Sequence, residues 1–369
     1  MNPVIIFLFL VSARPIFSVV GLGLLLMALV KFLNRNNSLD WFSHKSGQKS
    51  KTKDVAMAIL LGIFTFLFSV NGGWGGLSFT ENGGYEAIAP IVFLTITWIV
   101  RIINNGWVFA ENDLRRNLPY LNVVFLIDLS MRFSNMPSIN LDSLLFDFKY
   151  GGIFPTSNVA GYLACVCLVW SIILKEKKQV VIWSLLILFT SSRTSITAAT
   201  VALLSIRFGG GFRRIEIMTL AAVVGILVVY VTNINWSLES KFLILERFSE
   251  IFEEASNRER TFGLEGGRIA VWERLDIEAD GVLISPHNPF IKVGLYYGLI
   301  GELAFLYYLS SIQKQLRFIY LMHCFSGVAP FLSILSFGIK ATIEDREPHS
   351  KLVLALSRNR GYRYDPVRG

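Results

Sequence analysis

The sequence has few charged residues, few cysteines and few histidines. Asp, Glu, Lys and Arg make up 17% of its 369 residues, whereas 53% are hydrophobic. A chain of this length would suggest two or three soluble domains, but so little charge argues against folding in water. The apolar runs also lack the alternation of polar and apolar positions that membrane β-barrel strands show. The composition therefore predicts an all-α fold, a polytopic transmembrane helical bundle of about 10–12 spans, some of them short or broken.

Cysteine and histidine are too scarce to support a disulfide framework or a metal site. Cys165 and Cys167 lie two residues apart in one apolar run, a spacing that directs them to different faces of a helix, and Cys324 lies in another run. The sequence also lacks a Gly-rich nucleotide loop, a paired acidic metal motif and a nucleophile with an adjacent base. It therefore predicts no cofactor and no metal. Any chemistry would use a pre-activated donor, with arginines in place of a divalent cation.

The net charge of +8 arises from short clusters of Lys and Arg between the apolar runs. Such clusters are typical of cytoplasmic membrane loops, so the charge indicates topology and no nucleic-acid partner. The loop that follows the span Ile16 to Leu33 is strongly basic, which makes it cytoplasmic. Residues 3–11 are apolar but only about half the length of a span. The next spans are expected at residues 55–70, 88–103, 118–131 and 159–174.

The apolar region Val180 to Ile206 predicts a hairpin. As one helix it would be about 40 Å long and would place the basic clusters before and after it on opposite faces of the membrane. Two short helices hinged at Ser191-Ser192-Arg193 return both clusters to the cytoplasm. Helix ends left open by the hinge can line a polar cavity, and we expect Arg193 to face it.

After a span at residues 215–231, the long hydrophilic segment within residues 233–287 is expected on the external side. Leu238, Phe242, Leu245, Phe248 and Phe252 recur there at helical spacing, which predicts a helix on the membrane surface. A loop is expected at residues 257–267 and a second short helix at residues 268–279. The next span is expected at residues 290–309.

The last apolar region, residues 318–338, has two interpretations. A break at residues 327–330 makes it a short hairpin and leaves the basic tail, residues 340–369, in the cytoplasm, whereas a single crossing places the tail outside. The charge rule favours the hairpin. Residues 1–339 are then expected to form one transmembrane domain that includes the external segment.

Three residues are candidates for chemistry. Inserting an arginine such as Arg193 near the bilayer centre costs about 2.5–3.5 kcal/mol of free energy, which indicates a function such as bidentate phosphate binding. The alternative is that Arg193 pairs with an acid such as Asp128. His287 lies between two prolines at the threshold of an apolar run and could accept a proton from a sugar hydroxyl. The alternative is that His287 and Asn288 cap the next helix. Arg268 alone would be a surface arginine, and His323 is interpreted as a satisfied interior residue.

Three groups of residues, in this order, resemble the O-antigen ligase and polysaccharide polymerase superfamily of bacterial inner membranes. The first is Gly152-Ile153-Phe154 followed by Asn158-Val159-Ala160-Gly161, similar to a G-x-F…N-x-x-G external turn. The second is Thr190 to Ser195, similar to a Ser-Arg hairpin. The third is Gly267-Arg268, His287-Asn288 and Gly298 to Gly301, which resembles the large external loop and the span after it.

This resemblance implies metal-independent glycosyl transfer from a glycan carried on undecaprenyl pyrophosphate to a glycan or lipid A core acceptor. Arg193 and Arg268 would hold the pyrophosphate, and His287 would orient or deprotonate the acceptor. Asn158 and Asn288 would contact sugar or support the structure. The resemblance also implies a multi-pass protein among the lipids of a bacterial inner membrane, with its site facing the periplasm and a chain-length regulator as a further partner.

Polymerisation of lipid-linked repeat units into O-antigen, capsule or exopolysaccharide is the leading hypothesis. An O-antigen ligase that passes the finished chain to lipid A core shares the donor chemistry, but the short outer loop and compact chain favour a polymerase. A non-catalytic transporter of lipid-linked sugars would distribute charges along an internal path. The distinctive charges here concentrate toward the expected outer face instead.

Overall fold

The computed structural model describes residues 3–10, 15–35, 48–71, 90–92, 94–96, 98–99, 111–136, 151–190, 192–208, 235–265, 274, 278–279, 282–283, 288–311 and 314–323. These residues are helical apart from connections and one pair of two-residue strands, which confirms the all-α fold class. The predicted span at 215–231, hinge at 327–330 and tail at 340–369 lie outside the described residues. The helices are α1 (Pro3–Leu10), α2 (Pro15–Arg35), α3 (Gln48–Val70), α5 (Glu111–Ser134), α7 (Ser157–Ile173), α8 (Lys177–Phe189), α9 (Arg193–Phe208), α11 (Asn235–Glu254), α12 (Asn257–Phe262), α14 (Pro289–Ser311) and α15 (Lys314–His323).

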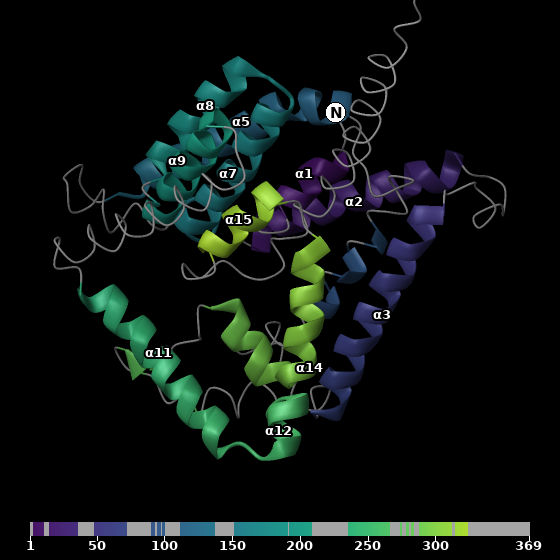
Figure 1. Ribbon diagram of the computed structural model, residues 1–369. Coiled ribbons are helices and arrows are strands. Elements are labelled where there is room, and N and C mark those ends of the chain that lie inside the picture. Colours follow the sequence, from purple (N-terminus) through teal and green to yellow (C-terminus); the bar gives the residue numbers. More distant parts are fainter. Residues whose placement is uncertain are drawn as a thin grey trace, which may run out of the picture.

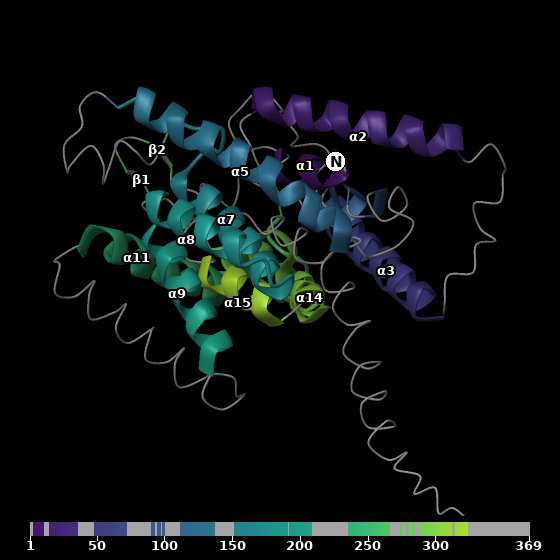
Figure 2. The ribbon, with the colours of Figure 1, turned by 90° about the horizontal axis from the view of Figure 1, so that it is seen from above.

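Helix α7 lies at the centre of the packing. Each residue from Val159 to Ser171 is buried, as expected for a helix that is apolar all round. It packs against α5, α8, α9 and α15, and we call these five helices the hairpin unit (Figure 1). From α1, Phe9 adds edge-on ring contacts with Trp170 of α7 and Phe125 of α5. Figure 2 shows α2 along one edge of the molecule, with α5 beside the α7–α8–α9 group.

The predicted break in the apolar region 180–206 is confirmed. Helix α8 ends at Phe189 and α9 begins at Arg193, so the region forms two helices. At one end of α7, Arg115 of α5 donates to Leu174 O at 2.7 Å and pairs with Glu176. At the opposite end, Asn158 bonds Ser192 between α8 and α9. The tip of the hairpin therefore lies beside the first turn of α7, about 20 Å along α8 from the basic cluster at its start.

The span expected at residues 290–309 coincides with helix α14, but α14 is not one straight helix. The backbone of Gly298 has φ 62° and breaks the helix into two halves. The ring centroids of Phe290 and Phe305 lie 5.4 Å apart, whereas a straight helix would separate these residues by about 22 Å. Figure 1 shows the two halves of α14 meeting in a V next to α12 and α3. We call α3, α12 and α14 the V unit.

By length and composition, one stretch of the described residues, Pro289–Ser310 of α14, is apolar enough to cross a membrane. The apolar stretches Val20–Val30, Val55–Val70 and Ser157–Ile173 are shorter. A buried helix of a soluble protein passes the same test, and the V of α14 folds this stretch back on itself. The expectation of a multi-pass membrane protein therefore stays a prediction.

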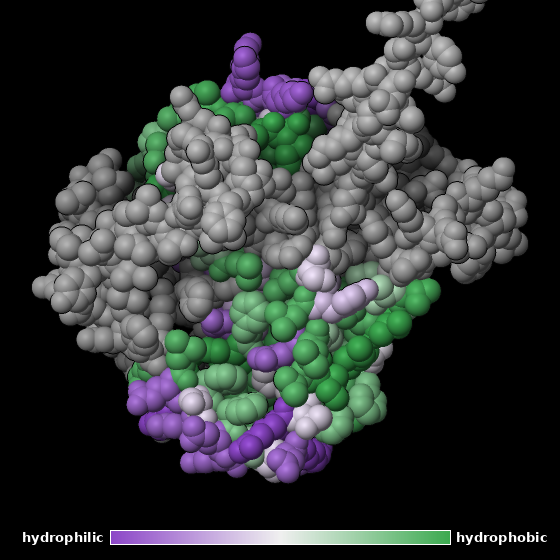
Figure 3. Space-filling model, viewed as in Figure 1, coloured by the Kyte–Doolittle hydropathy of each residue, from purple (hydrophilic) through white to green (hydrophobic). Residues whose placement is uncertain are grey.

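Large apolar side chains cover the outward faces of several helices. On α14, Leu299 and Leu303 are 53% and 58% exposed, one turn apart. The same holds on α2, α3, α5 and α8, where exposed side chains include Leu26, Met27, Ile59, Phe66, Val123, Leu126, Leu185 and Leu188. Figure 3 shows hydrophobic residues over α3 and α14, between hydrophilic residues along α11 and α12 at the bottom and a second hydrophilic group at the top.

The external segment contains the predicted amphipathic helix, α11. Leu245 and Phe252 on its predicted apolar face are exposed, whereas Ile244 and Ile251 pack against the protein. The loop expected at 257–267 is wrong, because α12 occupies Asn257–Phe262. A capping box begins it, since Ser256 Oγ accepts from Glu259 N while the Glu259 carboxylate accepts from Ser256 N.

The helix expected at residues 268–279 does not reach residue 279. Strand β1 (Glu278–Ala279) pairs antiparallel with β2 (Val282–Leu283). The pairing of Ala279 with Val282 leaves two residues between the strands. The sequence there is Asp280-Gly281, a dipeptide typical of two-residue hairpins.

Candidate functional site

Two of the motifs noted in the sequence meet at the tip of the α8–α9 hairpin. Ser192 Oγ donates to Asn158 Oδ1 at 2.9 Å, across 34 positions of the chain. Asn158 lies in the first turn of α7, where Thr156 is the N-cap and accepts a hydrogen bond from Val159 N. The Asn158 side chain thus holds the residue that directly precedes Arg193.

The polar chain continues from Ser192 into the protein interior. The hydroxyl oxygens of Ser195 and Ser192 lie 2.8 Å apart, and Ser195 Oγ lies 2.8 Å from Nε2 of His323 on α15. The other ring nitrogen, Nδ1, lies 2.7 Å from Ile319 O and carries a proton there, because a carbonyl oxygen only accepts. Ser192, Ser195 and His323 are all buried. We call Asn158, Ser192, Ser195 and His323 the polar chain.

Gly161 allows α9 to approach α7 at this point. A Cβ on Gly161 would overlap the Ser195 side chain and lie 3.1 Å from Ser192 Cβ. One turn further along α7, Cys165 Sγ donates to Ser195 O at 3.3 Å. The N-x-x-G motif therefore has a structural explanation, because Asn158 bonds the tip of the hairpin and Gly161 makes room for α9.

A buried ion pair holds the turn that leads into α7. Arg132 Nε donates to Asp128 Oδ2 at 2.8 Å, one turn apart on α5, and both side chains are buried. The pair also binds the backbone of Phe154, whose N–H donates to Asp128 at 2.9 Å and whose carbonyl accepts from Arg132 at 3.0 Å. A Cβ on Gly152 would overlap Asp128 Oδ1. Asp128 therefore pairs with Arg132, while the side chain of Arg193, its alternative partner from the sequence, lies outside the described residues.

The structure places the predicted site residues unequally. Arg193 is the first residue of α9, while its side chain, Arg268 and His287 lie outside the described residues. Asn288 caps α14, since its Oδ1 accepts from Phe290 N at 2.9 Å and Pro289 occupies the first helical position. The capping role considered for Asn288 is confirmed. Convergence of Arg193, Arg268 and His287 stays a prediction.

Aromatic side chains connect the start of α14 to the polar chain. The ring of Phe290 contacts Phe305, Phe305 contacts Tyr320 of α15, and Tyr320 contacts Tyr162 of α7. Tyr162 in turn lies edge-on to the imidazole of His323, with centroids 5.2 Å apart. The segment that begins at Asn288 and the tip of the hairpin are thus joined through one continuous interior.

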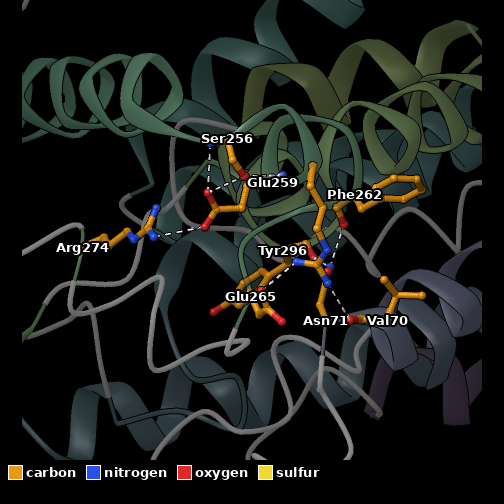
Figure 4. A network of polar contacts seen from close by, with 9 residues as sticks. Val70, Asn71, Ser256, Glu259, Phe262, Glu265, Arg274 and Tyr296 are labelled. Atoms are coloured by element: carbon orange, nitrogen blue, oxygen red, sulfur yellow. Dashed lines mark hydrogen bonds and ion pairs between the residues drawn. The ribbon is translucent and has the colours of Figure 1, made fainter.

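A second polar network joins the V unit (Figure 4). Asn71, at the end of α3, donates from Nδ2 to Phe262 O at 2.6 Å and Tyr296 O at 2.9 Å. Arg258 pairs with Glu265 at 2.9 Å and donates to Val70 O at 3.2 Å. These bonds hold the end of α3 against α12 and α14.

Glu259 stabilises the start of α12 in the same network (Figure 4). Hydrogen bonds from the backbone and hydroxyl of Ser256 lower the pKa of its carboxyl, and Arg274, 3.0 Å away, lowers it further. The carboxylate is therefore ionised at neutral pH. Its partners are structural groups of the loop, so the network fixes the external segment.

The structure adds residues that sequence analysis missed. Asp128 and Arg132 have the i, i+4 spacing of a helical ion pair, which could have revealed them. The Ser-x-x-Glu spacing of Ser256 and Glu259 could have revealed α12. The link between His323 and Ser195 has no local signal, because 128 positions separate the two residues.

Comparisons with known proteins identify no family. A scan against protein-family models finds no match, and a search of curated proteins finds no significant match. Within the described residues, no three His, Cys, Asp or Glu side chains are grouped as metal ligands would be. The side chains of the polar chain hold the start of α9, and the first residue of α9 is Arg193.

Proposed function

We propose that this chain is a membrane-embedded glycosyltransferase that polymerises oligosaccharide repeat units carried on undecaprenyl pyrophosphate. The observation that carries the proposal is the 2.9 Å bond between Asn158 and Ser192. It joins the N-x-x-G and Ser-Arg segments, two of the three groups on which the resemblance depends. The N-x-x-G segment and the Ser-Arg segment therefore lie side by side, as a shared site requires.

The apolar outer faces support a location within lipid. A soluble protein rarely exposes apolar patches larger than a few hundred Å², whereas here five helices present large apolar side chains outward. Basic residues Lys175, Lys177 and Lys178 lie at the end of the hairpin unit opposite the Asn158–Ser192 bond. By the positive-inside rule that end is cytoplasmic, so the tip of the hairpin lies toward the exterior.

Arg193 is well placed to bind a pyrophosphate. It is the first residue of α9, where the first backbone N–H groups of a helix lack intrahelical partners and favour an anion. A guanidinium group offers two parallel donors to phosphate oxygens and keeps its charge at any physiological pH. Donors that are already fixed in place stabilise the charge that the pyrophosphate gains as it leaves.

The proposed reaction needs no metal ion or other cofactor. The acceptor hydroxyl oxygen attacks the anomeric carbon of the donor sugar and forms the new glycosidic bond. The bond from that carbon to the pyrophosphate oxygen breaks, and its electron pair leaves with the lipid pyrophosphate. His287 takes the hydroxyl proton, while Arg193 and Arg268 stabilise the leaving group.

Reconstitution of the purified protein with lipid-linked repeat units tests the proposal. A ladder of longer glycans is the expected product. Transfer only to added lipid A core would identify the protein as a ligase instead of a polymerase. Movement of the substrate across the bilayer without new bonds would identify it as a transporter.

Single variants test the residue assignment in the same assay. Arg193→Ala, Arg268→Ala and His287→Ala should each abolish chain growth while the protein still inserts. Arg247→Ala is the matched control, because Arg247 is exposed on α11 and pairs with Glu250 at 2.7 Å. It should leave the ladder unchanged. Normal polymer from the first three variants would refute the assignment.

A further inference from the structure

His323 has a hydrogen-bond partner for each of its two ring nitrogens, and the two partners lie on different helices. Its Nδ1 bond to Ile319 O, one turn earlier on α15, already satisfies one ring nitrogen within the helix. The other nitrogen reaches out of α15 to Ser195 of α9, 128 positions away in the chain. The imidazole therefore connects two helices.

The connection ends at the residues on both sides of Arg193. Ser195 Oγ lies 2.8 Å from Ser192 Oγ, and Ser192 Oγ donates to Asn158 at 2.9 Å, so hydroxyl groups lie one position before and two positions after Arg193. The backbone of the same turn is held as well, because Ser195 N donates to Ser192 Oγ and Ser195 O accepts from Cys165. Gly161 lets this turn lie close against α7, because a Cβ there would overlap Ser195.

We infer that His323 is a positioning residue for Arg193, fixing the first turn of α9 against α7 and α15 through Ser195 and Ser192. The inference rests on the proposed function in one respect, namely that Arg193 binds the pyrophosphate. A guanidinium group must lie within a few tenths of an ångström of its place to bind two phosphate oxygens at once. A buried chain of hydrogen bonds gives such precision, because breaking one bond leaves a desolvated partner.

Two variants at position 323 separate positioning from packing. In His323→Gln, the side-chain amide occupies the place of Nε2 and can donate to or accept from Ser195. The shorter side chain in His323→Asn reaches only the place of Nδ1, near Ile319 O. Binding of farnesyl pyrophosphate to the detergent-solubilised protein should weaken about tenfold in His323→Asn and remain near wild type in His323→Gln. The double variant Arg193→Ala with His323→Asn should bind only slightly more weakly than Arg193→Ala alone, because both substitutions act through the contact of Arg193 with the pyrophosphate.

Amide hydrogen exchange gives a readout that does not depend on the ligand. Exchange in the peptide covering residues 192–198 should rise in His323→Asn and stay at the wild-type rate in His323→Gln. Unchanged exchange in His323→Asn, or affinity losses that multiply in the double variant, would overturn the positioning role. If the exchange rises as expected but wild type binds no farnesyl pyrophosphate, the proposed function fails while the anchoring of the turn stands.

Discussion

The hairpin unit and the V unit both reverse the chain within apolar sequence, but they use different groups to do so. At the tip of the hairpin, the side chains of Asn158, Ser192, Ser195 and His323 contact one another, and the last three are buried. At the point of the V, backbone is the partner, since a Cβ on Gly298 would lie 2.5 Å from Gly263 N, Leu264 N donates to Leu295 O at 2.8 Å, and the side chain of Asn71 bonds backbone carbonyls.

This difference predicts how well each reversal of the chain tolerates amino-acid substitution. A hydrogen-bonded side chain can be replaced by another that keeps the bond, so the hairpin tip can be altered step by step. A glycine with positive φ pressed against backbone has no substitute among L-residues. We therefore expect the hairpin unit to carry chemistry and the V unit to serve as a rigid support.

The largest expected effect lies in the hairpin unit, at the ion pair of Asp128 and Arg132. Arg132→Met removes the guanidinium and leaves the Asp128 carboxylate buried without its partner, which should cost about 3–5 kcal/mol of unfolding free energy. Denaturant unfolding of the solubilised protein measures this loss. Hydrogen exchange should rise in residues 151–173 but not in α14, if the two units are held independently.

Two further variants control this experiment. Arg116→Met, on the exposed face of α5, should change stability by less than about 0.5 kcal/mol. The double variant Asp128→Leu with Arg132→Met removes both charges and should recover much of the loss. A single variant as stable as wild type would show that the pair does not hold the turn before α7.

Next in size is the effect of Gly298→Ala in the V unit. The backbone φ of 62° is strained for alanine, and the added Cβ meets backbone that cannot rotate away, so the loss should be about 2–4 kcal/mol. Thermal unfolding measures it. Gly62→Ala on α3 is the matched control, because nothing lies within 4 Å of its added Cβ and alanine favours a helix. Equal losses in the two variants would mean that the V does not depend on Gly298.

The two reversals also differ in how far the sequence predicts them. The hairpin was predicted because basic clusters at both ends of residues 180–206 require a return to one side. The V was not, although Gly298 was noticed, because Gly294, Gly298 and Gly301 all lie in the same apolar run. Only Gly298 of these three has positive φ, and its contact with Gly263, distant in sequence, decides the break.

The candidate site shows the same limit. Asn158 was expected to contact sugar or support the structure, and the structure joins its side chain to Ser192, the neighbour of Arg193. His323 was interpreted as a satisfied interior residue, which its burial and bonds confirm. The sequence could not show that Ser195 is its partner, because hydrogen bonds between distant helices leave no periodic pattern.

The smallest expected effect concerns Glu259, which fixes α12 beside the V. Because hydrogen bonds lower its folded pKa below the usual 4.5, ionised Glu259 stabilises α12 at neutral pH, and this stabilisation is lost as the pH falls through the folded pKa. Glu259→Gln keeps an acceptor for Ser256 but weakens the contact with Arg274. Hydrogen exchange of residues 256–263 should therefore rise less than about fivefold at pH 7, and variant and wild type should converge in acid. A difference that persists in acid would assign the effect to the shape of the side chain and not to the charge of Glu259.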